Sequence, residues 1–377
     1  ATGSDGQVLT STGAGSPPAF EAAASGGASD LDGLSDAKSG GTDFTNSLII
    51  GHQTTGTLSS AEKNTAVGYT TLDSITSGEK NTAVGFQSMT ANTTGSSNVA
   101  YGGYSLDANQ DGDDNVAIGN SALGSNISGD DNTAVGRLAL STNTVSDNTA
   151  IGYSALTANT TGADNVAVGS LALDANTTAS NNTAVGKSAL GANTTGTRNV
   201  SVGALALDAN TTATDNTAVG YNAMTATTTS GYNTAIGSDA LSANTTGTKN
   251  TAVGYYASKG GNGDNNVALG YDALLVSSAS NNVAVGYHTL RTNSTGDNNV
   301  AIGSTAMHGN TTGGHNTAVG GKALVVNTTG TSNTAIGYEA LTANTTADNN
   351  TAVGKNSLKA NTTGGSNVAV GHNALDA

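Results

Sequence analysis

A five-residue motif, Asn-(Thr/Val)-Ala-(Val/Ile)-Gly, recurs along almost the whole chain. Its twenty copies begin at residue 47, and the motif glycines run from Gly51 to Gly371. Successive glycines are 17 residues apart except in three places, where the spacing is 16. A short fixed period is the signature of a solenoid or a similar array, in which each repeat packs against its neighbours. The repeat therefore constrains the fold more than any other feature of the sequence.

Composition excludes several classes of protein. The 377 residues carry a net charge of −15 and only 4% aromatic residues, which is typical of disordered chains, but the ordered repeat contradicts disorder. The absence of cysteine excludes zinc–thiolate, iron–sulfur and disulfide chemistry. No apolar run is long enough to predict a membrane span. The excess of 27 acidic over 12 basic residues disfavours a nucleic-acid-binding surface.

The repeat at 182–197 shows how one coil is predicted to fold. Residues 183–185 alternate with the two-residue period of a β-strand, and Gly186 ends that strand where a tight bend needs positive φ. Residues 189–192 form a second short alternating segment, and 193–196 form a polar turn. A helical solenoid is the competing architecture, but apolar segments of four or five residues are too short for it. We predict an all-β parallel solenoid of about twenty coils, rising roughly 95 Å in total.

Each position of the coil has a predicted role. Leu190 and Val185 represent the two columns expected to form a thin continuous core. Asn182 represents a column that is Asn in 19 of 20 copies, and we predict a buried ladder of these amides. Strand alternation then points Ala184 outward, and the residue three after Gly186 is expected to face outward as well. Uniformly small outward residues favour close approach of another chain, and small residues suited to crowded turns are the alternative.

Ten Asn-Thr-Thr segments match the sequon for N-glycosylation, among them Asn92, Asn159, Asn176 and Asn193. They recur with the period of the solenoid. We therefore interpret them as turns rather than as glycosylation sites.

The sequence predicts no active site, no cofactor and no metal centre, and the protein is not expected to be an enzyme. The five histidines show no repeated ligand spacing, and acidic turns such as 111–114 lack the spacing of a calcium-binding repeat. Coils of 16 or 17 residues leave no long loop to form a lid or a cleft.

Aromatic residues that directly follow a motif glycine are the candidate surface contacts. They are expected on one edge of the coils, where they either stack on the sugars of a host surface or pack against the next coil or chain. Packing is the favoured interpretation. The candidates are Tyr153, Tyr221, Tyr271, Tyr287 and Tyr338.

The repeat Asn-Thr-Ala-Val-Gly-x-x-Ala-Leu-x-Ala-Asn-Thr-Thr-Gly resembles two groups of fibrous proteins. One is the head repeats of trimeric autotransporter adhesins, and the closer is the β-roll shafts of phage tail fibres. The resemblance covers residues 47–377 and implies a homotrimer of left-handed parallel β-rolls. The segment before it, residues 1–46, is rich in Gly, Ala and Ser and is predicted to be a connector.

The resemblance implies a structural function. We expect the shaft of a trimeric phage tail fibre that presents a tip for host attachment, located in the virion or outside the cell. A cell-surface adhesin or an extracellular filament subunit that binds through its own shaft is the alternative. Expected partners are a baseplate or other fibre protein on the N-terminal side, a cap, tip or chaperone beyond Ala377, and host glycans. A cap is expected because six residues after Gly371 cannot cover the last strand edge.

Overall fold

The computed structural model describes residues 7–10, 19–22, 37–39, 47–50 and 59–376. The chain forms two compact units, residues 1–130 and 131–377, although the period of the repeat does not change at their boundary. Strand is the only regular structure in the described residues, and none of their segments is a helix able to cross a membrane.

The first unit contains an antiparallel hairpin, β1 with β2, and a ladder in which β3 pairs antiparallel with β4 and β4 to β8 pair in parallel. The hairpin and β3 are the described parts of the predicted connector. The bounds are β1 Gln7–Thr10, β2 Ala19–Ala22, β3 Ala37–Ser39, β4 Leu48–Ile50, β5 Thr65–Val67, β6 Thr82–Val84, β7 Val99–Tyr101 and β8 Val116–Ile118.

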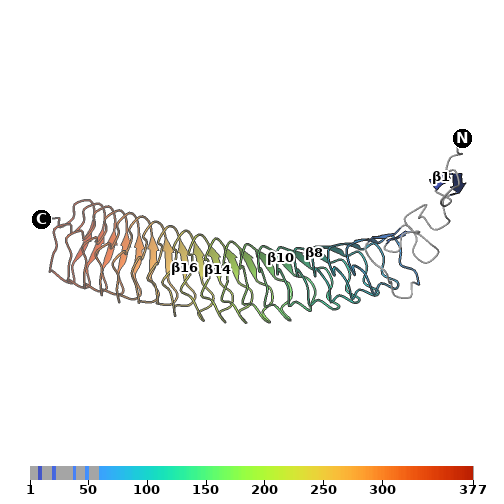
Figure 1. Ribbon diagram of the computed structural model, residues 1–377. Helices are drawn as coiled ribbons and strands as arrows, with labels where there is room; N and C mark the ends of the chain where they lie inside the picture. The colour runs from blue at the N-terminus through green and yellow to red at the C-terminus, as the bar shows by residue number, and fades with distance from the viewer. Residues whose placement is uncertain (1–6, 11–18, 23–36, 40–46, 51–58, 377) are drawn as a thin grey trace. The chain divides into compact units, whose positions relative to one another are not determined.

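The second unit is a parallel ladder of fifteen three-residue strands, each paired with the strand one coil away (Figure 1). The bounds are β9 Thr133–Val135, β10 Thr149–Ile151, β11 Val166–Val168, β12 Thr183–Val185, β13 Val200–Val202, β14 Thr217–Val219, β15 Thr234–Ile236, β16 Thr251–Val253, β17 Val267–Leu269, β18 Val283–Val285, β19 Val300–Ile302, β20 Thr317–Val319, β21 Thr334–Ile336, β22 Thr351–Val353 and β23 Val368–Val370.

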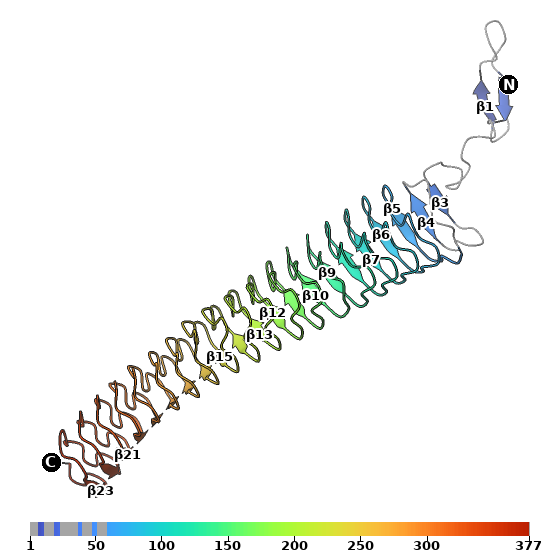
Figure 2. The same ribbon diagram turned by 90° about the horizontal axis from the view of Figure 1, so that it is seen from below.

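The fold is a parallel β-solenoid of about 18 turns with a 17-residue period, as the sequence predicts. Pairing is in register, so that Thr183 lies opposite Val200 and Val185 opposite Val202. Figure 2 shows successive labelled strands following one another along the coils of each unit. The 16-residue coils keep the same register, since Thr251 still pairs with Val267.

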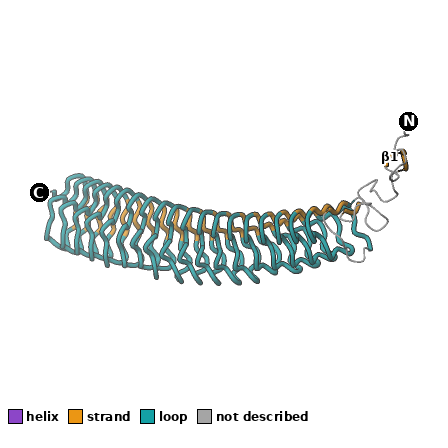
Figure 3. Tube along the Cα trace, in the orientation of Figure 1, coloured by secondary structure: helices purple, strands orange, loops and turns teal. Residues whose placement is uncertain are grey.

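The second half of each coil differs from the prediction. Residues 189–192 form turns rather than a second strand, and Figure 3 shows strands on one side of the coils with loops completing them. Ser188 and Leu190 both have φ of 53°, in the left-handed region. A segment in which every second residue has a left-handed backbone cannot adopt the extended conformation that a strand requires. The prediction of a second strand from the alternating apolar residues at 189–192 is therefore wrong.

The motif glycine is required both by its backbone and by its surroundings. Gly186 has φ of 138°, a conformation that side chains disfavour. A Cβ atom added there would lie 2.5 Å from the carbonyl oxygen of Gly203 in the next coil. The glycine column therefore lets successive coils approach at the corner where the strand ends.

The interior is lined by small residues, which corrects two predicted orientations. Ala184, Ala189 and Leu190 are completely buried, whereas Val185 is only partly covered and faces outward. The alanine columns predicted to face outward thus form the core together with the leucines. The prediction for Leu190 and for a buried Asn182 is confirmed.

The reason is the narrowness of the coil. Ser201 occupies the alanine position of β13, and its Oγ donates a hydrogen bond of 2.7 Å to the carbonyl of Ala206, in the turn segment that follows Gly203. At this position the turn lies so close to the strand that a methyl group fits but a valine side chain does not, because protein interiors are already packed to the density of organic crystals. The larger β-branched residues are therefore placed outside.

Candidate functional site

Two asparagine ladders run through the interior, and they hold successive coils together. In the ladder predicted from the sequence, Asn182 Oδ1 accepts a hydrogen bond of 3.0 Å from the backbone nitrogen of Asn199. Asn182 Nδ2 donates to the carbonyl of Gly196 at 2.9 Å. Buried polar groups are stable only when they are hydrogen-bonded, and here both ends of the amide are satisfied. Asn182 is thus a structural residue.

The second ladder is formed by the asparagines of the Asn-Thr-Thr segments, which the sequence analysis assigned only to turns. Asn193 Nδ2 donates to Asn176 Oδ1 at 3.0 Å and to the carbonyl of Gly196 at 3.0 Å. Asn210 Nδ2 donates in turn to Asn193 Oδ1 at 2.8 Å. The recurrence of Asn at this position was the available signal. Because these amides are buried and hydrogen-bonded, they are not positioned as glycosylation acceptors in the folded chain.

The acidic turns also serve neighbouring coils. Asp113 Oδ1 accepts a hydrogen bond of 2.7 Å from the backbone nitrogen of Ser96, and Asp297 Oδ1 accepts one of 2.7 Å from Ser280. These carboxylates thus satisfy backbone donors one coil away. Among the described residues, no group of three or more His, Asp or Glu side chains is arranged to hold a metal ion.

The outer face of the second unit is the most extensive candidate surface. We define it as the first and third residues of strands β9–β23, which are Thr or Val followed by Val, Ile or Leu. These side chains are partly exposed in regular rows; Ile151, for example, is 40% exposed and Val200 37% exposed. An exposed surface with a regular apolar row is a candidate site of protein association.

Aromatic side chains form the second candidate surface. All five predicted contact residues lie on the surface and are about half exposed, including Tyr221 at 54% and Tyr338 at 47%. Only some pack against a neighbouring coil: the rings of Tyr271 and Tyr287 stack with centroids 5.6 Å apart. The five are therefore not gathered into one site.

Charges accompany some of these rings. Arg137 lies 5.8 Å from the ring centroid of Tyr153, and Lys322 lies 5.9 Å from that of Tyr338. Beside Tyr338, a hydrogen bond of 2.7 Å from Lys359, followed by one from Tyr338, lowers the pKa of Glu339 to about 2. Glu339 is consequently ionised at neutral pH and anchored to lysines rather than available as a proton donor.

The geometry defines a β-solenoid repeat protein with regular surfaces along its coils. No protein-family model matches the chain, and no curated protein matches it either.

Proposed function

We propose that this chain forms the shaft of an extended homotrimeric fibre that holds a tip away from its base. The fibre most similar to the one proposed is the phage tail fibre. The observation that carries the proposal is the outer face of β9–β23. Rows of exposed Val, Ile and Thr repeat at every coil, and such rows on three identical chains match one another in register. The alanine columns no longer support association, because they lie inside the coil.

The size of the outer face fits this role. Fifteen strands spaced ~4.8 Å apart and three residues wide give a surface of roughly 67 by 10 Å, or about 700 Å². A stable protein interface buries about 800 Å² on each partner. One face of the second unit is therefore nearly sufficient for association on its own.

The number of chains and the handedness follow from the resemblance to fibre shafts, which implies three left-handed β-rolls around a common axis. The same resemblance supports a location in the virion or outside the cell. It also supports a baseplate or fibre protein as partner on one side and a tip or chaperone on the other.

Sedimentation equilibrium of the full chain tests the proposal. We expect three times the mass of one chain, and elongated particles in negative-stain electron micrographs. Val168→Lys combined with Val185→Lys places charge on the outer face and should convert the trimer into single chains. Thr195→Lys combined with Thr212→Lys adds the same charge at exposed turns and should leave the trimer intact. A monomeric wild-type chain at micromolar concentration would disprove the proposal.

A surface adhesin that binds through its own shaft is the second candidate. The exposed tyrosines favour it, since aromatic rings are effective contact residues at interfaces. Binding of the full chain to host cells or their surface polysaccharide, lost on replacement of the exposed tyrosines but not of outer-face valines, would favour this function.

A further inference from the structure

Two interior columns of the second unit are incomplete between Gly254 and Gly286, where two consecutive coils have 16 residues. In the first of these coils Ser258 replaces the buried Leu, and its buried Oγ has no hydrogen-bond partner within the described residues. In both coils the second asparagine ladder is interrupted, by Gly261 and by Ser277. Contacts on the outside of these coils therefore matter more for holding them together than they do elsewhere.

A row of tyrosines lies on the outside of the same coils. Tyr255, Tyr271 and Tyr287 directly follow the motif glycines of three consecutive coils. The centroid of the Tyr271 ring lies 5.4 Å from that of Tyr255 and 5.6 Å from that of Tyr287, with interplanar angles of 23° and 25°. Within the described residues, every ring contact between two tyrosines involves a member of this row. A reaction that joins two phenols is thus favoured here over other places in the chain.

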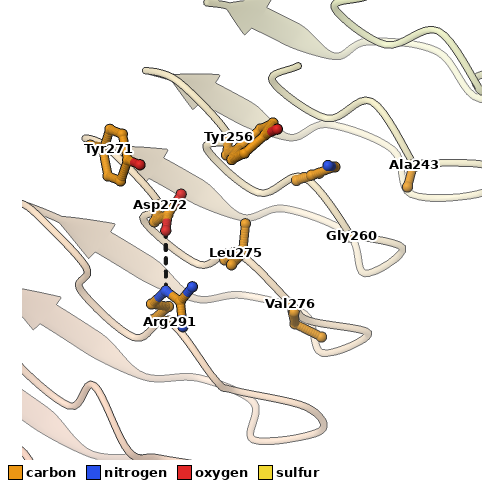
Figure 4. A pocket seen from close by; sticks show the side chains of 9 residues that line it. Ala243, Tyr256, Gly260, Tyr271, Asp272, Leu275, Val276 and Arg291 are labelled. Atoms are coloured by element: carbon orange, nitrogen blue, oxygen red, sulfur yellow. Dashed lines mark hydrogen bonds and ion pairs between the residues drawn. The ribbon is translucent and has the colours of Figure 1, made fainter. Parts of the chain in front are cut away.

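Tyr271 and Tyr287 are the pair best placed for such a reaction. Their side chains are 46% and 53% exposed, so a soluble oxidant can reach both. A hollow of about 480 Å³ beside Tyr271 leaves space for its ring to tilt and turn an edge toward its partner (Figure 4). The phenol of Tyr255 is engaged instead by Tyr256, and this hydrogen bond, together with desolvation, raises the pKa of Tyr255 to about 12. Its proton leaves less readily, which disfavours its oxidation.

We propose that Tyr271 and Tyr287 form a site of oxidative cross-linking, at which hydrogen peroxide, acting through a haem peroxidase, joins the two rings as dityrosine. Each phenol gives one electron to the peroxidase and one proton to water. The two tyrosyl radicals form a carbon–carbon bond between ring carbons next to the hydroxyl groups, and the hydrogens on those carbons move to the oxygens. The protein loses two hydrogen atoms, and one molecule of hydrogen peroxide becomes two of water.

The cross-link spans one 16-residue coil, the coil that contains Ser277. A covalent link of this kind restricts the unfolded chain, as a disulfide does. We therefore expect the cross-linked chain to unfold at a higher temperature than the untreated chain. The inference concerns a single chain and does not depend on the proposed fibre function.

The test treats the full chain with a haem peroxidase and a limiting amount of hydrogen peroxide, then unfolds it and digests it with trypsin. Cleavage after Lys259 and Arg291 releases the peptide 260–291, whose only tyrosines are Tyr271 and Tyr287. We expect dityrosine fluorescence and the loss of two hydrogen masses from this single peptide. A link between two chains would instead join two peptides.

Tyr287→Phe retains a stacked ring but lacks the phenol, so it should abolish the mass loss in peptide 260–291. Tyr338→Phe is the matched control, because it removes a phenol from the same repeat position outside this row and should leave the mass loss unchanged. Circular dichroism of each variant verifies folding, and Tyr271→Phe repeats the test should Tyr287→Phe fail to fold.

Three results would each overturn the proposed site: an unchanged mass of peptide 260–291 in the oxidised wild-type chain, a main product that joins other tyrosines or two chains, and undiminished cross-linking in Tyr287→Phe. An unchanged unfolding temperature of the cross-linked chain would overturn its stabilising role.

Discussion

Individual positions of the coil differ most in which side of the strand they face. Ala184 is enclosed between two walls, whereas Val185, its neighbour in the sequence, lies on the outer face. A conservative change in size should therefore have opposite consequences at the two positions.

We expect Ala184→Leu to destabilise the coil by about 1–3 kcal/mol, because an overpacked interior forces strained side chains and backbone shifts. Val185→Leu is the matched control, since its side chain has space outside. Thermal unfolding measures both. Equal midpoints for the two variants would contradict the placement of alanine inside the solenoid.

Three aspartates share one repeat position, and partial burial disfavours the charged form of each carboxylate. Desolvation raises the pKa of Asp208 and of Asp174, and the charge of Asp208 raises that of Asp174 further. Both carboxylates lean toward Gly191, in the coil between them, where an added Cβ would lie 3.2 Å from Asp208 Oδ1 and 3.4 Å from Asp174 Oδ1. Asp107, the third, has a pKa raised by burial as well.

A raised pKa in the folded state means that folding favours the protonated acid. The corresponding stability is present below the unfolded pKa of about 4 and is lost as the pH rises through the folded value. We therefore expect Asp208→Asn to raise the melting temperature at pH 7, with the difference shrinking at pH 3. Asp215→Asn is the control of opposite sign, because the hydrogen bond from Arg198 lowers the pKa of Asp215. That variant should melt earlier than wild type at pH 7 and match it at low pH.

At the level of the coil, the second asparagine ladder is the element that connects turns across the interior. It is interrupted where Thr227 replaces asparagine, and the buried Oδ1 of Asn210 in the preceding coil consequently has no donor among the described residues. Thr227 Oγ1 donates instead to the carbonyl of Asn244 at 3.0 Å.

Thr227→Asn should complete the ladder and stabilise the protein by about 1 kcal/mol, the net value of one buried hydrogen bond. The reverse change, Asn193→Thr, removes the bonds to Asn176 and Gly196 and leaves acceptors unsatisfied, so a loss of roughly 1–3 kcal/mol is expected. Urea unfolding compares the pair. A destabilising Thr227→Asn would show that the ladder does not tolerate a further amide.

Across the whole second unit, stability is expected to be the sum of coils and of contacts between adjacent coils. Removal of residues 187–203 deletes one full period and returns every column to its register. That variant should retain the circular dichroism of the wild type, with only a small decrease in unfolding free energy. Removal of residues 187–194 shifts Asn, Ala and Leu columns by about half a coil and should abolish cooperative unfolding. Similar unfolding curves for both deletions would contradict a register-dependent solenoid.

The sequence by itself determined the period, the parallel stacking and the buried columns of Leu190 and Asn182. These features depend on identical residues that recur at a fixed interval, and a single chain shows that recurrence directly. The pattern Thr183-Ala184-Val185 likewise established a strand with two different faces.

Only the tertiary structure decided which of those faces is inside. Alternation separates two sets of residues but carries no information on the distance from the strand to the turn packed against it. The hydrogen bond from Ser201 to Ala206 shows that at the central strand position this distance suits only a small side chain. The same limit hid the second asparagine ladder and the ion pairs of Asp272. Asn193 looks like a turn residue until the neighbouring coils enclose it, and the partners of Asp272 lie nineteen and sixteen residues further on, at Arg291 and His288. Periodicity fixes which residues are equivalent, whereas burial and pairing depend on what lies across the coil.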